Sequence, residues 1–286
     1  MIDFHTHVFP PFFRENREEL VQKDPAFARL YSSPGAKMVG VEELLEHMER
    51  EEIEHSVVFG FPWLSQELFK QHNDYVGEVG ARYSDKLSAF CCFHPLSQAA
   101  AQEADRCLKS GFSGIGELAL YDRGLSRETI KAMGEVMGIA SGFNAPVMIH
   151  VNEPVGHRYP GKAPLNLKQI FSLLLAYPDN RIILAHWGGG LFFYALLKKE
   201  VKEVFSKVWF DTAASPYLYE SKIYKLAGEI VGFHKILFGT DYPLLPASRY
   251  KDELRMVGLS KGQIEMITDQ NARKLLGLAE KRGGMW

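Results

Sequence analysis

Eight short apolar runs, separated by longer amphipathic stretches, are the feature that most limits what this chain can fold into. Each run has the length and the β-branched or apolar character of a buried strand, and strands that alternate with helices are typical of a parallel sheet. The runs are Ile2–Val8, His55–Gly60, Leu87–Phe93, Gly114–Leu118, Val147–Val151, Ile182–His186, Val208–Thr212 and Ile236–Thr240. A repeat of about 36 residues per unit fits a (β/α)8 TIM barrel of roughly 250 residues.

The stretches between the runs are predicted to be helices, and several of them open on a Ser or Asn suited to cap a helix N-terminus. The helices are expected to begin near Val41, Ser65, Ser97, Ser126, Asn166, Leu191, Tyr219 and Ser248. The structural alternative is a doubly wound open sheet, which usually carries a glycine-rich dinucleotide-binding turn after its first strand. His-Thr-His-Val-Phe-Pro occupies that position here, so the barrel is preferred.

Two segments fall outside the eight units. The connection Phe9–Gly40 is too long for an ordinary strand-to-helix loop and is interrupted by prolines, so we predict a lid over the mouth of the barrel. Leu259–Leu278 has apolar residues at helical spacing and predicts one extra C-terminal helix. The sequence shows no linker or low-complexity segment, and the prediction is one domain over residues 1–286.

The composition excludes several classes of protein. With 46% hydrophobic residues and a net charge of −2, the chain has ample material for a core and no general attraction to nucleic acid or anionic lipid. Leu191–Leu197 is the longest apolar run, far short of a membrane helix. Three cysteines and the absence of a basic, apolar leader predict a soluble cytoplasmic protein with reduced thiols. A small molecule is the expected partner, and a homo-oligomer stays open.

Residues suited to bind a metal ion fall at the ends of five of the predicted strands. Side chains alternate along a strand, so His5 and His7 point to the same side, near the C-terminal end of the first run. The later members are Glu117, His150, His186 and Asp241. Strand ends meet at one mouth of a closed barrel, where barrel enzymes place their sites. The alternative requires five separately buried polar groups, each with its own hydrogen-bond partner, and is less economical.

This combination resembles the amidohydrolase superfamily of metal-dependent barrel hydrolases. Ala185–Gly189, Phe238–Pro243 and the Asn271-Ala272 element are similar to its small amidohydrolase-related (amidohydrolase 2) branch, which contains hydrolases, non-oxidative decarboxylases and hydratases. The resemblance spans the whole chain. It implies a metal ion, typically zinc, and the ligands it implies are His5, His7, His150 and Asp241.

The roles of the remaining candidates follow from their chemistry. Neutral imidazoles leave a divalent ion enough Lewis acidity to give hydroxide near neutral pH, and Asp241 can accept the proton of that water. His186 either binds a second ion or polarises the substrate carbonyl. Glu117 either bridges two ions or hydrogen-bonds a ligand of one. One or two divalent ions are therefore expected, with a preference for one firmly held ion.

Candidate substrate contacts are less specific. The loop from Asn152 to Pro164 is dense in polar groups, namely Glu153, His157, Arg158, Tyr159 and Lys162, as an ordinary solvated loop would also be. Arg158 and Arg123 are the candidates for binding a substrate carboxylate, because a guanidinium can form two parallel hydrogen bonds with a carboxylate. His157 and Trp187 are further candidates, although core packing explains most aromatic residues. Asp211 is expected either to orient a neighbouring ligand or to cap the following turn.

The predicted function is hydrolysis of a small carbonyl compound such as an ester, lactone or amide by metal-activated water. The alternative is a decarboxylase or hydratase of an unsaturated or aromatic carboxylic acid on the same site, since ligands and fold do not set the reaction. Glu117 favours hydrolysis. A glutamate on the fourth predicted strand is also similar to TatD-like phosphodiesterases, but the balanced charge of the chain gives no basic cluster to hold phosphates. A third hypothesis, from a different functional class, is a non-catalytic barrel that binds a metabolite. The loss of one of the metal ligands from the sequence would indicate it.

Overall fold

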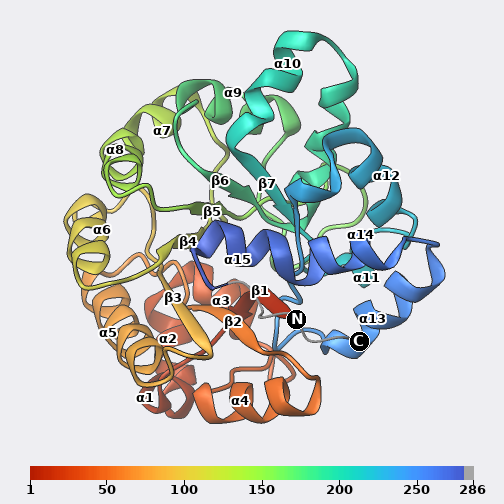
Figure 1. Cartoon of the computed structure of the whole chain (residues 1–286). Coiled ribbons are helices and arrows are strands. Elements are labelled where there is room, and N and C mark those ends of the chain that lie inside the picture. The colour runs from red at the N-terminus through yellow and green to blue at the C-terminus, as the bar shows by residue number, and fades with distance from the viewer. Residues whose placement is uncertain (280–286) are drawn as a thin grey trace.

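Eight parallel strands pair in sequence order, from the first to the last, inside a ring of helices (Figure 1). The computed structural model describes residues 1–279, so 280–286 of the predicted single domain lie outside the described part. The strands are β1 (Ile2–His7), β2 (His55–Phe59), β3 (Leu87–Cys91), β4 (Gly114–Leu118), β5 (Val147–Ile149), β6 (Ile182–Leu184), β7 (Val208–Asp211) and β8 (Ile236–Leu237). The backbone N–H of Phe4 donates to the Phe238 carbonyl at 2.7 Å, and that of Asp241 donates to the His5 carbonyl at 3.0 Å. These bonds join β8 to β1, and the predicted TIM barrel is confirmed.

Most strands end one to three residues earlier than the apolar runs predict. The fifth, sixth and eighth runs were expected to reach Val151, His186 and Thr240, but the strands stop at Ile149, Leu184 and Leu237. The chain leaves the sheet at these points and turns toward the mouth. His186 and Asp241 have positive φ angles of 53° and 62°, which no regular strand allows. The apolar runs therefore include the first residues of the turns that carry the candidate site.

The helices that surround the barrel begin close to their predicted N-caps in most units. They are α4 (Val41–Arg50), α5 (Gln66–Arg82), α6 (Ala100–Lys109), α7 (Arg127–Ala132), α8 (Gly134–Gly142), α9 (Leu167–Ala176), α10 (Lys199–Val204), α11 (Ser215–Leu218), α12 (Ile223–Val231) and α13 (Ala247–Met256). Ser65, Ser126 and Asn166 accept backbone hydrogen bonds as caps. The helix predicted near Leu191 is a 3₁₀ segment instead of an α-helix: it spans residues 186–196 and is kinked where four successive residues from Trp187 have positive φ.

The segment between β1 and α4 forms three short helices, α1 (Pro11–Glu15), α2 (Arg17–Lys23) and α3 (Pro25–Tyr31). The rings of Phe13 and Phe27 pack on Trp63, with centroids 5.1 and 4.5 Å away. Arg29 donates to the backbone carbonyl of Tyr121 in the turn after β4. The segment therefore covers loops that follow β2 and β4, on the side of the mouth, as expected for a lid.

The predicted C-terminal helix is a continuous helical stretch made of α14 (Lys261–Glu265), a π-helical turn (Met266–Gln270) and α15 (Asn271–Leu276). Phe238 donates its N–H to the Ile267 carbonyl at 3.0 Å. Ala272 and Leu275 of α15 join the apolar cluster inside the barrel. Figure 1 shows α15 lying across one end of the barrel, beside the N-terminus. This packing closes the N-terminal end, and the site lies at the opposite end.

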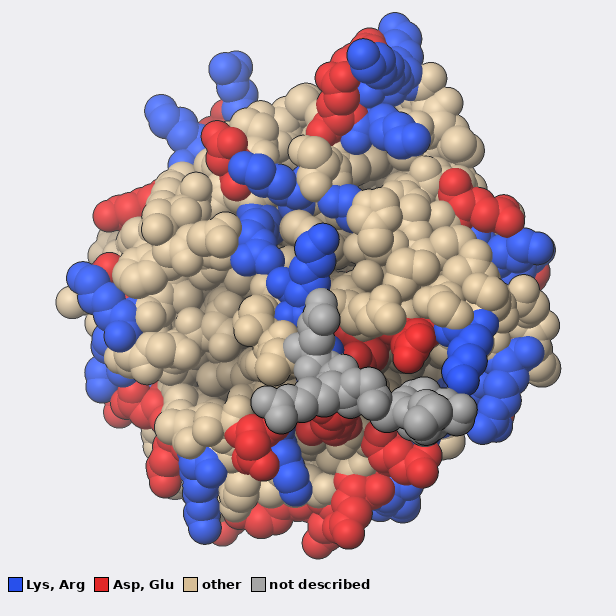
Figure 2. Space-filling view, viewed as in Figure 1, with Lys and Arg blue, Asp and Glu red and all other residues tan. Residues whose placement is uncertain are grey.

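The outer surface carries charges of both signs. On the face seen in Figure 2, basic and acidic side chains are interspersed. Among the described residues, none of the helices combines the length and the apolar character needed to cross a bilayer.

Candidate metal centre

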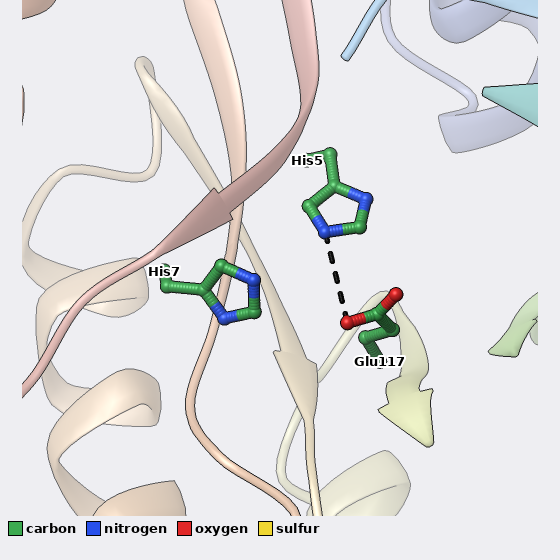
Figure 3. Close-up of side chains that lie close together, drawn as sticks. All are labelled: His5, His7 and Glu117. Carbon is green, nitrogen blue, oxygen red and sulfur yellow. Dashed lines mark ion pairs between the residues drawn. The ribbon is translucent and has the colours of Figure 1, made fainter. Parts of the chain in front are cut away.

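His5 and His7 lie side by side on β1, with ring centroids 5.3 Å apart (Figure 3). The Phe59 ring of β2 contacts both, at 5.0 and 4.7 Å, and so restricts their rotation. Asp241, on the turn after β8, approaches the pair: its Oδ1 lies 3.6 Å from Nε2 of His5 and 3.3 Å from Nε2 of His7. Residues from the two ends of the barrel sequence therefore meet, because β8 closes against β1.

Glu117, at the end of β4, lies between two groups of imidazoles. Its Oε2 is 3.8 Å from Nε2 of His5, the contact drawn in Figure 3. Its Oε1 is 2.9 Å from Nδ1 of His150 and 3.5 Å from Nε2 of His186. The two oxygens of one carboxylate thus face different imidazoles.

The six predicted side chains gather at one mouth in three overlapping groups, in each of which the ligand atoms lie within 4.8 Å of one another. The groups are His5, His7 and Glu117; His5, His186 and Asp241; and Glu117, His150 and His186. His150 belongs only to the last of these groups in the described part of the chain. The structure therefore places His150 with Glu117 and His186, and not in one compact set with the His5–His7 pair and Asp241.

Each of the four imidazoles has one ring nitrogen fixed by an oxygen outside the centre. The pairs are His5 Nδ1 with Asp211 Oδ2 at 2.9 Å, His7 Nδ1 with the Gly60 carbonyl at 3.3 Å, His186 Nδ1 with the Ala213 carbonyl at 2.9 Å, and His150 Nε2 with the Gly161 carbonyl at 2.9 Å. Carbonyl and carboxylate oxygens only accept hydrogen bonds, so the ring nitrogens donate. The second nitrogen of each ring faces the carboxylates of the centre, and with a cation bound there it would present its lone pair to the ion, as in histidines that bind metal ions.

The electrostatics of the centre favour positive charge. Burial lowers the pKa of His5, but the carboxylates of Asp211 and Glu117 raise it, and the net pKa is about 10. Burial also lowers the pKa of His186, but Glu117 raises it to about 9. Conversely, burial raises the pKa of Glu117, while His150 and His5 hold it well below its usual range. Nε2 of His5 is buried without a hydrogen-bond partner and faces the carboxylates of Glu117 and Asp241. A divalent cation fits here, because imidazoles and carboxylates are suitable donors for zinc or manganese.

Asp211 and Asp3 orient the candidate ligands from behind. Oδ1 of Asp211 accepts the N–H groups of His186 at 2.9 Å and Ala213 at 3.0 Å, so the residue both orients ligands and caps the turn. Sequence reasoning missed Asp3, which accepts the Thr240 hydroxyl at 2.6 Å and the His5 N–H at 3.1 Å. Burial raises the pKa of Asp3 to about 7. The available signal was its position on β1, two residues before His5 and on the same face.

The four predicted substrate contacts lie elsewhere. Trp187 is fully buried, donates its indole N–H to Ser215 and packs on Tyr224, so it belongs to the core and not to the wall of the mouth. Arg123 is exposed and donates twice to Asp122, which occupies its guanidinium. His157 and Arg158 are exposed on the loop after β5. For the residues that the structure describes, no hydrogen bond, ion pair or ring contact joins these four side chains to the centre.

Two tyrosines that the sequence did not single out approach the centre. The Tyr121 ring lies 5.1 Å from that of His150, and Phe61 connects it to Tyr31 of the lid through centroid distances of 6.3 and 5.9 Å. Burial raises the pKa of both phenols, and the nearby carboxylates add to this. The hydroxyl groups therefore stay protonated and able to donate. Tyr31, Phe61 and Tyr121 thus form a chain of aromatic contacts from the lid to His150, with phenol groups able to donate.

A family model described as Amidohydrolase matches residues 2–278. No curated protein matches the sequence. Among solved structures, 2,6-dihydroxybenzoate decarboxylase from Rhizobium is 19% identical with a TM-score of 0.69, over 97% of this chain and 98% of that one. The structure of 5-carboxyvanillate decarboxylase from Novosphingobium aromaticivorans, complexed with manganese and a nitrobenzoic acid, is 14% identical with a TM-score of 0.76, over 97% of this chain and 96% of that one. A probable 2-pyrone-4,6-dicarboxylic acid hydrolase from Acinetobacter baumannii is 15% identical with a TM-score of 0.63, over 96% of this chain and 98% of that one. At these identities the structures share the fold.

Proposed function

The chain belongs to the amidohydrolase family and is an enzyme, and from this premise we propose that it is a metal-dependent hydrolase of a small ester, lactone or amide. The observation that carries the proposal is the position of Glu117, with one oxygen toward His5 and the other toward His150 and His186. A carboxylate in this position can be shared by two cations. Paired cation sites occur in many hydrolytic enzymes, where they clamp the attacking and the leaving oxygen.

In this proposal His5, His7 and Asp241 would hold one ion, His150 and His186 would hold the second, and Glu117 would be shared. When bound, divalent ions supply Lewis acidity that activates water at neutral pH and polarises a carbonyl group. Zinc was expected from the resemblance, and the same imidazole and carboxylate donors also suit manganese, which is present in the 5-carboxyvanillate decarboxylase structure described above. The sequence favoured one ion, and the position of Glu117 now favours two.

The chain's own residues then manage protons and orientation. Burial raises the pKa of Asp241, but its hydrogen bond from His7 and the charge of His5 lower it below the usual value. Asp241 is therefore ionised at neutral pH, so Oδ1 can take a proton from water and pass it to the leaving group. Asp211 keeps the proton of His5 on Nδ1. Tyr31 and Tyr121 keep protonated hydroxyl groups, and in this proposal they would donate to an oxygen of the substrate.

A lyase that decarboxylates an aromatic acid is the second candidate, and the comparisons favour it over hydrolysis. Two of the three structures described above are decarboxylases of hydroxylated aromatic acids. The aromatic chain of Tyr31, Phe61 and Tyr121 would suit such a ring. A shared fold does not set the reaction, however, and the carboxylate between two imidazole groups is the feature that supports hydrolysis.

A substrate panel separates the two candidates. Protein loaded with zinc or manganese is assayed with esters, lactones and amides for release of acid, and with aromatic and dienoic acids for release of carbon dioxide. Hydrolysis is expected, with turnover lost in Glu117→Gln and kept in Glu135→Gln, which changes an exposed glutamate on α8. Carbon dioxide release without any hydrolysis would replace the proposal by the lyase.

A further inference from the structure

His150 differs from the other three imidazoles in how far from a strand its acceptor lies. His5 is fixed by Asp211 of β7, and His7 and His186 are fixed by carbonyls that closely follow β2 and β7. His150 instead donates to Gly161, in a segment between β5 and α9 that has no regular helix or strand. The orientation of His150 therefore depends on the conformation of that loop.

One partly buried ion pair holds the loop. Nζ of Lys162 lies 2.7 Å from Oε1 of Glu153 and 3.3 Å from the His157 carbonyl, and it also contacts the Val155 carbonyl. The Tyr159 hydroxyl donates to the other oxygen of Glu153 at 2.8 Å. The side chains of Lys162 and Glu153 are only 12% and 16% exposed, so the pair is weakly screened by solvent. The cation thus binds three separate points of the loop.

The ion pair is adjacent to the group that it would position. Lys162 directly follows Gly161, and its own N–H donates to the Tyr159 carbonyl at 3.0 Å. On the other side, the Ala163 N–H donates to Oδ1 of Asn152 at 2.8 Å, which closes the base of the loop next to β5. The Gly161 carbonyl therefore lies between two fixed points.

We propose that Lys162 is a positioning residue: by its contacts with Glu153 and the loop carbonyls, it holds the Gly161 carbonyl where it keeps His150 turned toward Glu117. This rests on the proposed two-ion site. Without the ammonium group the loop loses its central cation, Nε2 of His150 loses a fixed acceptor, and the ring is free to turn Nδ1 away. The affinity for the ion held by His150 and His186 should fall, while the affinity for the ion held by His5, His7 and Asp241 should not.

Manganese binding tests the inference directly. Protein stripped with a chelator is titrated with Mn²⁺, and free Mn²⁺ is read by electron paramagnetic resonance. Wild type is expected to bind two ions. Lys162→Met should lower the affinity for the second ion about 10–100-fold, the usual effect of losing a group that supports a ligand. The affinity for the first ion should stay within about twofold of wild type. Lys168→Met, at an exposed position on α9, is the matched control and should bind both ions as wild type does.

Glu153→Gln removes the other half of the ion pair and should act in the same direction, and it supplies the test if Lys162→Met does not fold. Two ions of wild-type affinity in both variants would overturn the inference and leave the proposed function intact. Equal weakening of both ions would also overturn it, because the loop would then not act through His150. A wild type that binds one ion removes the second site and with it this inference, and one that binds none removes the proposed function as well.

Discussion

Oδ2 of Asp211 accepts the Nδ1 proton of His5 at 2.9 Å, and both side chains are fully buried. The carboxylate thereby fixes the tautomer of the imidazole and leaves the Nε2 lone pair for a cation. Because Oδ1 of the same residue also accepts the His186 N–H, one side chain of β7 orients candidate ligands from two other strands.

Asp211→Asn should therefore reduce metal affinity without loss of the fold. The amide oxygen can still accept from His186, but the amide nitrogen now offers a proton to Nδ1 of His5. The imidazole proton then moves to Nε2, and the lone pair is lost. We expect about 10–100-fold weaker binding of the first ion in a Mn²⁺ titration. Asp179→Asn, at an exposed carboxylate, is the control; unchanged affinity in Asp211→Asn would refute the tautomer argument.

Asp241→Asn tests the proton-transfer step. An amide can no longer accept a proton from water, so turnover of the best substrate should fall at least about 100-fold, within the range for loss of a general base. The measurement is kcat under saturating substrate with metal content determined on the same sample. A variant that has full metal content and wild-type kcat would exclude Asp241 as the base.

His72 predicts how stability depends on pH. Its Nε2 donates to the Val8 carbonyl at 2.7 Å and its Nδ1 accepts from Trp63 at 2.9 Å, so the buried ring is neutral. Burial lowers the pKa of His72 to about 4, from 6.5 in the unfolded chain. Above pH 6.5 both states are neutral; as the pH falls toward 4, only the unfolded state takes up the proton, and stability is lost.

The expected contribution of His72 is a loss of about 2 kcal/mol in the free energy of unfolding between pH 7 and pH 5. Urea unfolding in the presence of a chelator measures it without interference from metal binding. His72→Gln retains an amide donor and an amide acceptor but cannot titrate, so its stability should fall less over this interval. Equal pH dependence in wild type and variant would contradict the assignment.

A pair of glycine substitutions tests the packing behind the centre. Gly189 has a φ of +61°, and a methyl group there would lie 2.4 Å from the carbonyl oxygen of Asn152. Gly189→Ala should lower the free energy of unfolding by about 3 kcal/mol, from backbone strain and overpacking together. Gly138, inside α8, has open space around it, and Gly138→Ala should raise stability by about 0.5–1 kcal/mol. Thermal unfolding of the two variants decides; the reverse order would refute this account of the turn after β6.

Sequence periodicity was enough for the barrel and for the meeting of His5, His7, Glu117 and Asp241, because parallel strand ends converge at one mouth. The acceptors that fix His7, His150 and His186 could not be predicted, since they are backbone carbonyls and any residue type supplies one.

Two other features depend on tertiary packing and not on local pattern. The lid helices α1 to α3 have five to seven residues each, too few to be stable alone, and form because Phe13 and Phe27 pack on Trp63. Trp187 was a candidate substrate contact, with core packing as the alternative. Its left-handed backbone conformation instead accompanies a ring buried in the core.

In the proposed centre, six side chains from five strand ends share divalent cations at one mouth of the barrel. Anomalous diffraction at the manganese edge, from crystals of manganese-loaded protein, measures this directly. Two peaks are expected at ligand distances of about 2.0–2.3 Å, one beside Nε2 of His5 and His7, the other beside Nδ1 of His150 and Nε2 of His186, with Glu117 between them. A fully loaded crystal with no peak beside any of these imidazoles would contradict it.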